Sequence, residues 1–179
     1  AIPSADAGVI SDAADNCSGP VTVTVSDADN GGTGCSGDPF IITRTFTLTD
    51  CSGLATNLVQ TITVEDTLAP AFVEALPQDA TLACDAAIPA AATLTAADNC
   101  SAATVVFDEQ IVNGGCTGSY DIIRTWIAAD ACGNETMHTQ TITVEDTTAP
   151  AFAEALPQDM TVECDKLPAA QVLTATDNC

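Results

Sequence analysis

Polar and apolar residues alternate along two nearly identical stretches of this 179-residue chain. Residues 60–70 read QTITVEDTLAP, and residues 140–150 read QTITVEDTTAP. In QTITV every second residue is apolar, so Ile62 and Val64 are expected to face one side of a β-strand, as are their counterparts in the second stretch. The Pro that ends each stretch cannot donate to a sheet. Each stretch is therefore predicted to be the last strand of a repeat and the linker to the next.

The 80-residue offset between residues 60 and 140 predicts tandem domains. We expect a first repeat at 1–66 that lacks its first strand, a complete repeat at 67–146, and the beginning of a third at 147–179. Alternation and regularly spaced turn residues predict only strands in the complete repeat, at 79–84, 92–96, 103–112, 120–129 and up to Val144. The expected fold is all-β: tandem immunoglobulin-like antiparallel β-sandwich domains, stapled by disulfides and arranged head to tail.

The chain is strongly acidic, with 25 Asp and Glu, 3 Lys and Arg, and a formal charge of −22. Such a surface repels nucleic acid and anionic membranes and attracts divalent cations. No apolar run is long enough to span a bilayer. Because no initiating Met or signal peptide is present, we expect a mature fragment or a window of a longer repetitive protein.

Nine widely spaced cysteines without a CxxC pair indicate a disulfide framework formed in an oxidising, extracytoplasmic location. They fall at equivalent positions of the repeats: Cys84, Cys100, Cys116 and Cys132 in the complete repeat, Cys17, Cys35 and Cys51 in the one before, and Cys164 and Cys179 in the one after.

Strand direction predicts the pairing, because successive antiparallel strands place alternate loops at the same end of a domain. A bond between neighbours such as Cys84 and Cys100 would have to cross a strand length of about 18 Å, which a disulfide cannot do. The predicted bonds are Cys84–Cys116, Cys100–Cys132 and Cys17–Cys51. The remaining cysteines are expected to lack partners within this chain: Cys35, Cys164 and Cys179.

Four motifs carry a family resemblance: TAADNC (95–100), TATDNC (174–179), AADACGN (128–134) and VEDTTAP (144–150). They resemble the hyalin-repeat-like (HYR-like), immunoglobulin-like domains found in tandem in very long surface proteins of gliding and marine Bacteroidota. The resemblance covers the whole chain. It implies an extracellular, cell-surface adhesin or filament protein exported by the type IX secretion system.

Carboxylates and amides gather where one repeat is expected to meet the next, and oxygen-rich clusters suit Ca²⁺. The candidate ligands at the first junction are Glu65, Asp66, Asp98, Asn99, Asp130 and Asn134, and those at the second are Glu145, Asp146, Asp177 and Asn178. A junction ion would stiffen the hinge. The alternative is that these Asp and Asn residues simply make turns.

Two threonines in the expected linkers are candidate modification sites. Thr67 and Thr147 follow Asp in Asp-Thr-Leu and Asp-Thr-Thr, which resemble the site at which Bacteroidota O-glycosylate exported proteins. The alternative is an unmodified linker threonine.

Arg44 and Arg124 occupy equivalent positions on the same face as Phe46 and Trp126. Stacking of guanidinium on the ring is the predicted reason for an Arg on an apolar face, and a ligand site is the alternative.

No catalytic motif is present, and the single histidine, His138, is replaced by Leu in the preceding repeat. An enzyme is not expected. The predicted function is a structural stalk or extracellular filament segment whose partners are neighbouring repeats or copies of itself. The alternative is an adhesin module that binds glycans or another surface through the loops at 26–39 and 113–119.

Overall fold

The computed structural model describes residues 3–11, 13–16, 19–116 and 118–179. Apart from a single 3₁₀ turn, η1 (Ala7–Val9), all its regular elements are strands, so the all-β prediction is confirmed. The chain forms two compact units. The first unit contains Ala1–Pro70 together with two loops of the second predicted repeat, Asp98–Ala103 and Ala129–Asn134; the remaining residues form the second unit.

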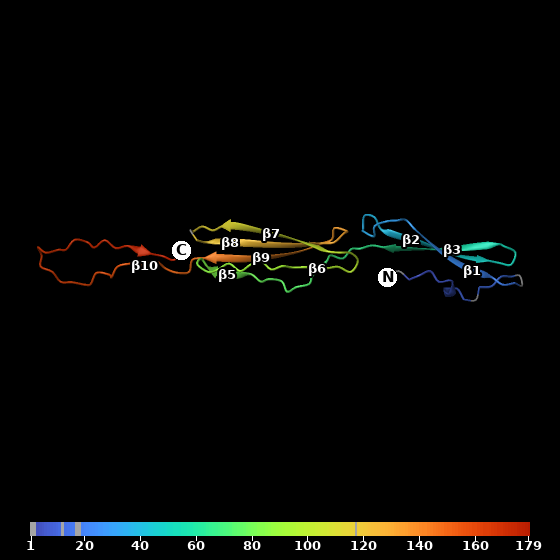
Figure 1. Ribbon diagram of the computed structural model, residues 1–179, viewed down its shortest axis with the longest axis horizontal. Coiled ribbons are helices and arrows are strands. Elements are labelled where there is room, and N and C mark those ends of the chain that lie inside the picture. The colour runs from blue at the N-terminus through green and yellow to red at the C-terminus, as the bar shows by residue number, and fades with distance from the viewer. Residues whose placement is uncertain (1–2, 12, 17–18, 117) are drawn as a thin grey trace. The chain divides into compact units, whose positions relative to one another are not determined.

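The first unit is built on a three-stranded antiparallel sheet in the order β1-β2-β3 (Figure 1). Its strands are β1 (Thr22–Asp29), β2 (Phe40–Thr49) and β3 (Ala55–Val64). Alternation along β2 places Ile42, Arg44 and Phe46 on one face, where all three are buried.

The second unit contains a four-stranded sheet in the order β5-β9-β8-β7 (Figure 1). Its strands are β5 (Ala80–Ala83), β7 (Thr104–Asn113), β8 (Tyr120–Ala129) and β9 (Glu135–Glu145). β5 runs parallel to β9, with Ala80 opposite Ile142, whereas only antiparallel pairing was expected. The two strands are distant in the sequence, so no tight hairpin forces them to run in opposite directions.

Two pairs of very short strands complete the second unit: β4 (Ala71–Phe72) with β6 (Ala96–Ala97), and β10 (Ala151–Phe152) with β11 (Ala175–Thr176). The strand predicted at 92–96 is therefore mostly irregular. The reason lies at Thr95, whose backbone N–H donates to a carboxylate oxygen of Glu74 at 2.6 Å instead of to a ladder partner. The hydrogen bonds from Thr95 lower the pKa of Glu74.

The core of the second unit lies on one face of the four-stranded sheet, where apolar side chains of the neighbouring strands β8 and β9 are buried together. Ile142 and Val144 are 0% and 1% exposed, which confirms the strand predicted from QTITV. Ile122 packs against both residues, and Trp126 is 1% exposed.

Ion pairs hold the two buried arginines, in place of the stacking that the sequence predicted. Arg44 donates to both carboxylate oxygens of Asp27 at 2.9 Å and to the carbonyl of Pro3 at 2.8 Å. Nε of Arg124 donates to one carboxylate oxygen of Glu109 at 2.7 Å, and the same guanidinium donates to the Pro89 carbonyl at 2.8 Å. The equivalent arginines thus tie the irregular segment of each repeat to its sheet.

Candidate functional site: disulfide junctions between repeats

The two disulfides found among the described residues join cysteines of successive repeats. Cys35 bonds to Cys132 across 97 residues, with Cα atoms 5.1 Å apart. Cys84 bonds to Cys179 across 95 residues, with Cα atoms 6.1 Å apart. Each separation exceeds the 80-residue repeat offset, and each bond lies within one compact unit. If the cysteines are numbered by their order in the four-cysteine repeat, the third cysteine of one repeat (Cys35) bonds to the fourth cysteine of the next (Cys132). The first cysteine of one repeat (Cys84) bonds to the second cysteine of the next (Cys179).

The predicted bonds Cys84–Cys116 and Cys100–Cys132 are therefore wrong. Cys100 and Cys116 are exposed and unpaired among the described residues. The prediction assumed that loops at the same end of one domain are the only loops close enough to bond. The first unit instead contains loops of two repeats, and the disulfide forms between those loops.

The remaining cysteines complete this account. Cys35 and Cys179 were expected to be unpaired and are bonded. The predicted Cys17–Cys51 bond falls on Cys17, which lies outside the described residues; Cys51 is exposed and unpaired in the part of the chain that the structure describes. Cys164 is likewise exposed and unpaired there.

The loop that carries Cys35 is shaped by backbone hydrogen bonds. Gly34 adopts a φ of 88°, which favours glycine, and its carbonyl accepts from the N–H of Asp66 at 2.7 Å. The Cys35 carbonyl accepts from the N–H of Asp38 at 2.9 Å. These bonds hold the cysteine in a tight turn next to the linker that leaves β3.

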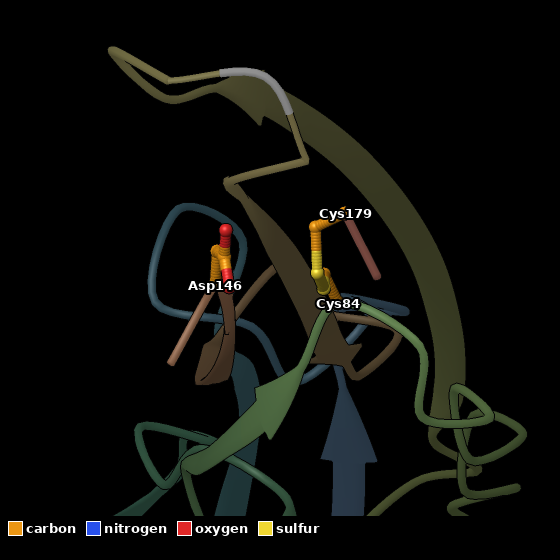
Figure 2. A group of neighbouring side chains, drawn as sticks. All are labelled: Cys84, Asp146 and Cys179. Carbon is orange, nitrogen blue, oxygen red and sulfur yellow. A yellow bond between two sulfur atoms is a disulfide. The ribbon is translucent and has the colours of Figure 1, made fainter. Parts of the chain in front are cut away.

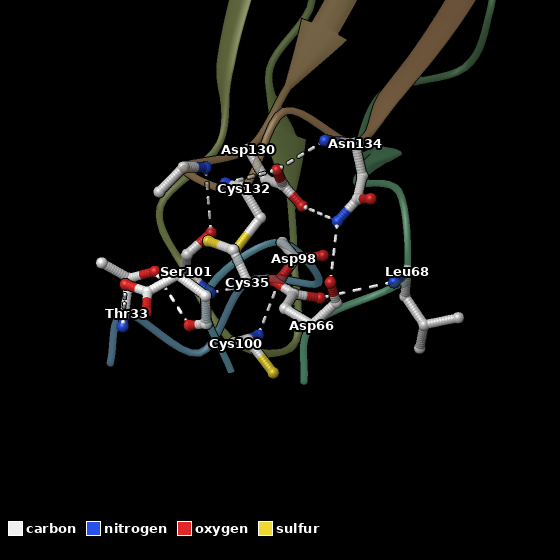
Figure 3. Close-up of a disulfide and its surroundings, with 12 residues drawn as sticks. Thr33, Cys35, Asp66, Leu68, Asp98, Cys100, Ser101, Asp130, Cys132 and Asn134 are labelled. Atoms are coloured by element: carbon white, nitrogen blue, oxygen red, sulfur yellow. Dashed lines mark hydrogen bonds between the residues drawn. A yellow bond between two sulfur atoms is a disulfide. The ribbon is translucent and has the colours of Figure 1, made fainter. Parts of the chain in front are cut away.

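The loop that carries Cys132 is organised by a single carboxylate (Figure 3). Oδ1 of Asp130 accepts from the backbone N–H groups of Cys132 and Asn134, each at 2.8 Å, and Gly133 closes the turn with a φ of 82°. Partial desolvation opposes ionisation, but these hydrogen bonds and the one from the Asn134 side chain hold the pKa of Asp130 below its usual value. The DACGN motif is therefore a turn that presents Cys132.

The second bridge joins Cys84, which directly follows β5, to Cys179 (Figure 2). The N–H of Cys84 donates to the carbonyl of Glu145 at 3.1 Å, which continues the parallel pairing of β5 and β9. Gly118 has a φ of 83°, and a Cβ built there would lie 3.2 Å from the Cβ of Cys179. No side chain fits at this position without moving the bridge.

Two of the six candidate ligands at the first junction come together. Ligand atoms of Asp66, Asp98 and Cys100 lie within 4.8 Å of one another. Asp66 is 5% exposed, and its Oδ2 has no hydrogen-bond partner among the described residues. Its other oxygen accepts only a 3.3 Å bond from the N–H of Leu68 (Figure 3). A buried carboxylate oxygen without a partner carries a large desolvation cost unless a cation or a proton neutralises it.

The other candidates at this junction have different surroundings. The Asp130 carboxylate already accepts hydrogen bonds within its own turn. The Asn134 side chain donates to this carboxylate at 2.8 Å and to the backbone carbonyl of Asp66 at 3.4 Å. Glu65 and Asn99 are exposed and lie outside the group that contains Asp66.

The second set of candidates surrounds the Cys84–Cys179 bridge. Asp146 lies beside both cysteines (Figure 2), whose sulfurs are engaged in the disulfide. Oδ1 of Asp177 accepts from the N–H groups of Asn178 and Cys179 at 2.6 and 3.3 Å, as in an Asx turn. Glu145 is exposed.

The unpaired thiol of Cys100 lies among carboxylates. Partial desolvation, together with the charges of Asp66 and Asp98, raises the pKa of this thiol. It is therefore protonated at neutral pH and reacts slowly as a nucleophile.

Other residues singled out from the sequence have simple environments. Thr67 and Thr147 are exposed. Nε2 of His138 lies 2.9 Å from the carbonyl of Pro77, and its ring centroid is 5.9 Å from that of Trp126. No helix among the described residues is long and apolar enough to cross a membrane.

The sequence model of a protein family described as HYR-like domain with 4 cysteines matches residues 3–64 and 72–144. No curated protein is significantly similar to the chain.

Proposed function

Because the chain belongs to the family of HYR-like domains with 4 cysteines, we propose that it is a structural stalk or filament segment of a long extracellular protein, in which disulfides carry load from one repeat to the next. Tandem HYR-like domains with disulfides fit an extracellular structural or adhesion module. The observation that favours a structural module over an adhesion module is that the Cys35–Cys132 and Cys84–Cys179 bonds both connect successive repeats.

A bond of this kind changes how tension passes along the chain. When the two ends are pulled, the force crosses the Cys35–Cys132 bond, and the 97 residues between these cysteines are relieved of it. The hidden segment contains the linker after β3, which lacks strand pairing between Thr67 and Pro70 and would otherwise extend first.

Single-molecule stretching tests this function. At about 3.4 Å per residue, a bridge across 97 residues hides roughly 330 Å of contour length. The chain pulled by its ends should therefore extend about 330 Å further after reduction than before. Bonds within repeats would hide about 110 Å in each of the two repeats that hold a predicted bond, or about 220 Å together. If reduction lengthens the chain by no more than bonds within repeats would hide, the Cys35–Cys132 bond does not carry load between repeats.

The adhesin alternative assigns binding to the loops at 26–39 and 113–119. The first of these loops carries Cys35 and is fixed by the bridge and by its own hydrogen bonds, which supports a structural use of the loop.

We include in the proposal a Ca²⁺ ion held by Asp66 and Asp98 at the first junction. The support is the buried, unpartnered Oδ2 of Asp66 beside a second carboxylate. CaCl₂ should raise the thermal unfolding midpoint of the oxidised chain, and Asp66→Asn should abolish that rise. Asp85→Asn, at an exposed position outside the group, is the matched control and should keep it. An equal rise of the unfolding midpoint in the unmodified chain and in both variants would contradict a Ca²⁺ ion held by Asp66.

The resemblance to Bacteroidota surface proteins adds two finer proposals: export by the type IX system to the surface of a gliding cell, and O-glycosylation of Thr67 and Thr147. Exposure of both threonines supports the modification. Intact-mass measurement of the native protein should show a glycan mass that Thr67→Ala and Thr147→Ala remove; an unmodified native mass would contradict it.

A further inference from the structure

β7 forms one edge of the four-stranded sheet in the second unit, whose order is β5-β9-β8-β7 (Figure 1). Among the described residues, β8 is the strand that pairs with it, so its other side is open. β1 holds the same place in the first unit, at one edge of the order β1-β2-β3. The equivalent strand is thus an edge in both repeats, and the open edge of β7 belongs to the repeat itself.

The two edge strands differ in their side chains. The large apolar residues of β1 are Val23 and Val25, which are half-buried, and the 3₁₀ turn η1 lies beside this strand. Natural proteins protect edge strands with polar residues or covering segments of this kind. The ten-residue strand β7 instead exposes large apolar side chains on both of its faces: Val106 at 64%, Phe107 at 44%, Ile111 at 63% and Val112 at 47%. Such an edge is suited to pair with a further strand.

An apolar pocket of about 260 Å³ lies against one face of β7. Val105 and Phe107 of β7 line it, together with Trp126 of β8 and the irregular segment 91–94. The rings of Phe107 and Trp126 pack with their centroids 5.1 Å apart, and Nε1 of Trp126 donates to the carbonyl of Ala92 at 3.0 Å. These contacts fix the walls of the pocket. The pocket can therefore take an apolar side chain from a strand that is added beside β7.

Two acidic residues, Asp108 and Glu109, lie at the centre of β7 between its apolar residues. Glu109 forms an ion pair with Arg124 at 2.7 Å. The Asp108 carboxylate is exposed and accepts a hydrogen bond from the neutral side chain of Gln110 at 3.1 Å. Because side chains alternate along a strand, Asp108 faces away from the side on which Phe107 lines the pocket. An added strand therefore meets an apolar pocket on one face and a carboxylate on the other.

Charge decides which kind of strand fits this edge. The chain has a formal charge of −22, and both of its arginines are buried. If β7 of a second copy paired antiparallel with β7 about their centres, Asp108 and Glu109 of each copy would lie beside those of the other. Like charges opposite each other destabilise a strand pair. The complementary strand instead carries Lys or Arg beside Asp108 and apolar residues on the side of the pocket.

We propose that the open edge of β7 binds an extended, basic segment of a partner protein, which adds to the sheet as a further strand. Main-chain hydrogen bonds to β7 supply affinity. An apolar side chain in the pocket beside Trp126 and a basic side chain beside Asp108 supply specificity. No residue of β7 belongs to either disulfide bridge, so this binding function is additional to the proposed load-bearing role and does not depend on it.

Hydrogen exchange on the intact, oxidised chain tests the proposal with a designed peptide, acetyl-TLKVRLT-amide. When extended, this peptide presents Leu, Val and Leu on one face and Lys and Arg on the other. At a peptide concentration of about ten times its dissociation constant, the fast-exchanging amides of β7 should exchange about tenfold more slowly. Protection confined to other strands, or no protection, would overturn the proposal.

Modified peptides separate strand addition from general attraction to an acidic protein. Two versions carry N-methyl groups on one or the other set of alternate residues, and both keep the charge and the side chains. Amides of alternate residues point to opposite sides of a strand, so only one version blocks the hydrogen bonds to β7. Protection of β7 should be lost with that version and kept with the other. Equal protection by the unmodified peptide and both versions would overturn strand addition.

A matched pair of variants tests the place of the basic residue. Asp108→Asn should weaken binding of the unmodified peptide about threefold, as measured by calorimetry, because an exposed ion pair is lost. Asp85→Asn removes the same charge at an exposed position outside β7 and should leave the affinity unchanged. An equal loss in the two variants would mean that the peptide responds to net charge alone and would overturn the site.

The exchange experiment without peptide tests the other occupant of this edge. Exchange of the β7 amides should not depend on the concentration of the chain. If these amides become protected as the chain is concentrated, β7 pairs with a second copy, and the assignment of the edge to a basic partner is overturned.

Discussion

Removal of the Cys35–Cys132 bond should destabilise the chain by several kcal/mol. The bond closes a loop of 97 residues. In the chain-entropy model, the bond changes the entropy of the unfolded chain by −2.1 − 1.5R ln n, where n is the number of residues in the loop. With n near 97 this is about −15.7 cal/mol/K, which stabilises the folded chain by about 4.7 kcal/mol at 25 °C. This exceeds the roughly 3.7 kcal/mol for a loop of about 32 residues within one repeat, because a longer loop loses more freedom when its ends are joined.

Urea unfolding followed by the fluorescence of Trp126 measures this effect. Trp126 is the only tryptophan, is 1% exposed, and lies within the loop that the bond closes. Cys35→Ala and Cys132→Ala should each lower the free energy of unfolding by about 4–5 kcal/mol. Cys100→Ala is the control, because Cys100 is exposed and unpaired in this chain. A large loss in Cys100→Ala with none in Cys35→Ala would refute the reasoning, since it would restore pairing within the repeat.

Two further predictions concern the surroundings of the bridges. Gly118→Ala should cost about 1–2 kcal/mol of unfolding free energy in a urea titration, because Gly118 has a φ of 83° and faces Cys179, whereas Gly115→Ala, with open space around it, should cost little; equal costs would contradict this. Thr95→Val keeps the backbone N–H donor, which is the larger cause of the lowered pKa of Glu74, and removes the hydroxyl donor, so it should raise this pKa part of the way toward its usual value, while Glu154 serves as the internal reference in a carboxyl NMR titration. Stability from this contact is complete above the usual Glu pKa and is lost as pH falls through the lowered folded-state value, so an unchanged pKa of Glu74 would contradict its role.

The sequence predicts best where the pattern is local. The strand expected at 120–129 has those bounds in the structure, because alternation over ten residues specifies both the element and its buried face. Most of the strand expected at 92–96 is irregular because the Glu74 carboxylate, 21 residues from Thr95, accepts the hydrogen bond of the Thr95 N–H. A contact of that range leaves no periodic signal.

The disulfides illustrate a second limit. Strand direction correctly excludes a Cys84–Cys100 bond but does not tell a loop of the same repeat from a loop of the next. The two bonds have nearly equal sequence separations: Cys35 and Cys132 are 97 residues apart, and Cys84 and Cys179 are 95 residues apart. That regularity distinguishes a bond between repeats only once both pairs are known.

The candidate cation site was predicted only in outline. Asp and Asn in the junction motifs marked the right loops, yet turn formation accounts for Asp130 and Asp177. The burial of Asp66 depends on the two loops of the second repeat that join the first unit, which no local pattern encodes.

The most direct measurement of the central claim is a disulfide map of the unreduced chain, digested at Asp and Glu after free thiols have been blocked. The account predicts fragments that join Cys35 to Cys132 and Cys84 to Cys179. Fragments that join Cys100 to Cys132 and Cys84 to Cys116 would contradict it, because every bond would then lie within a repeat and none would carry load to the next.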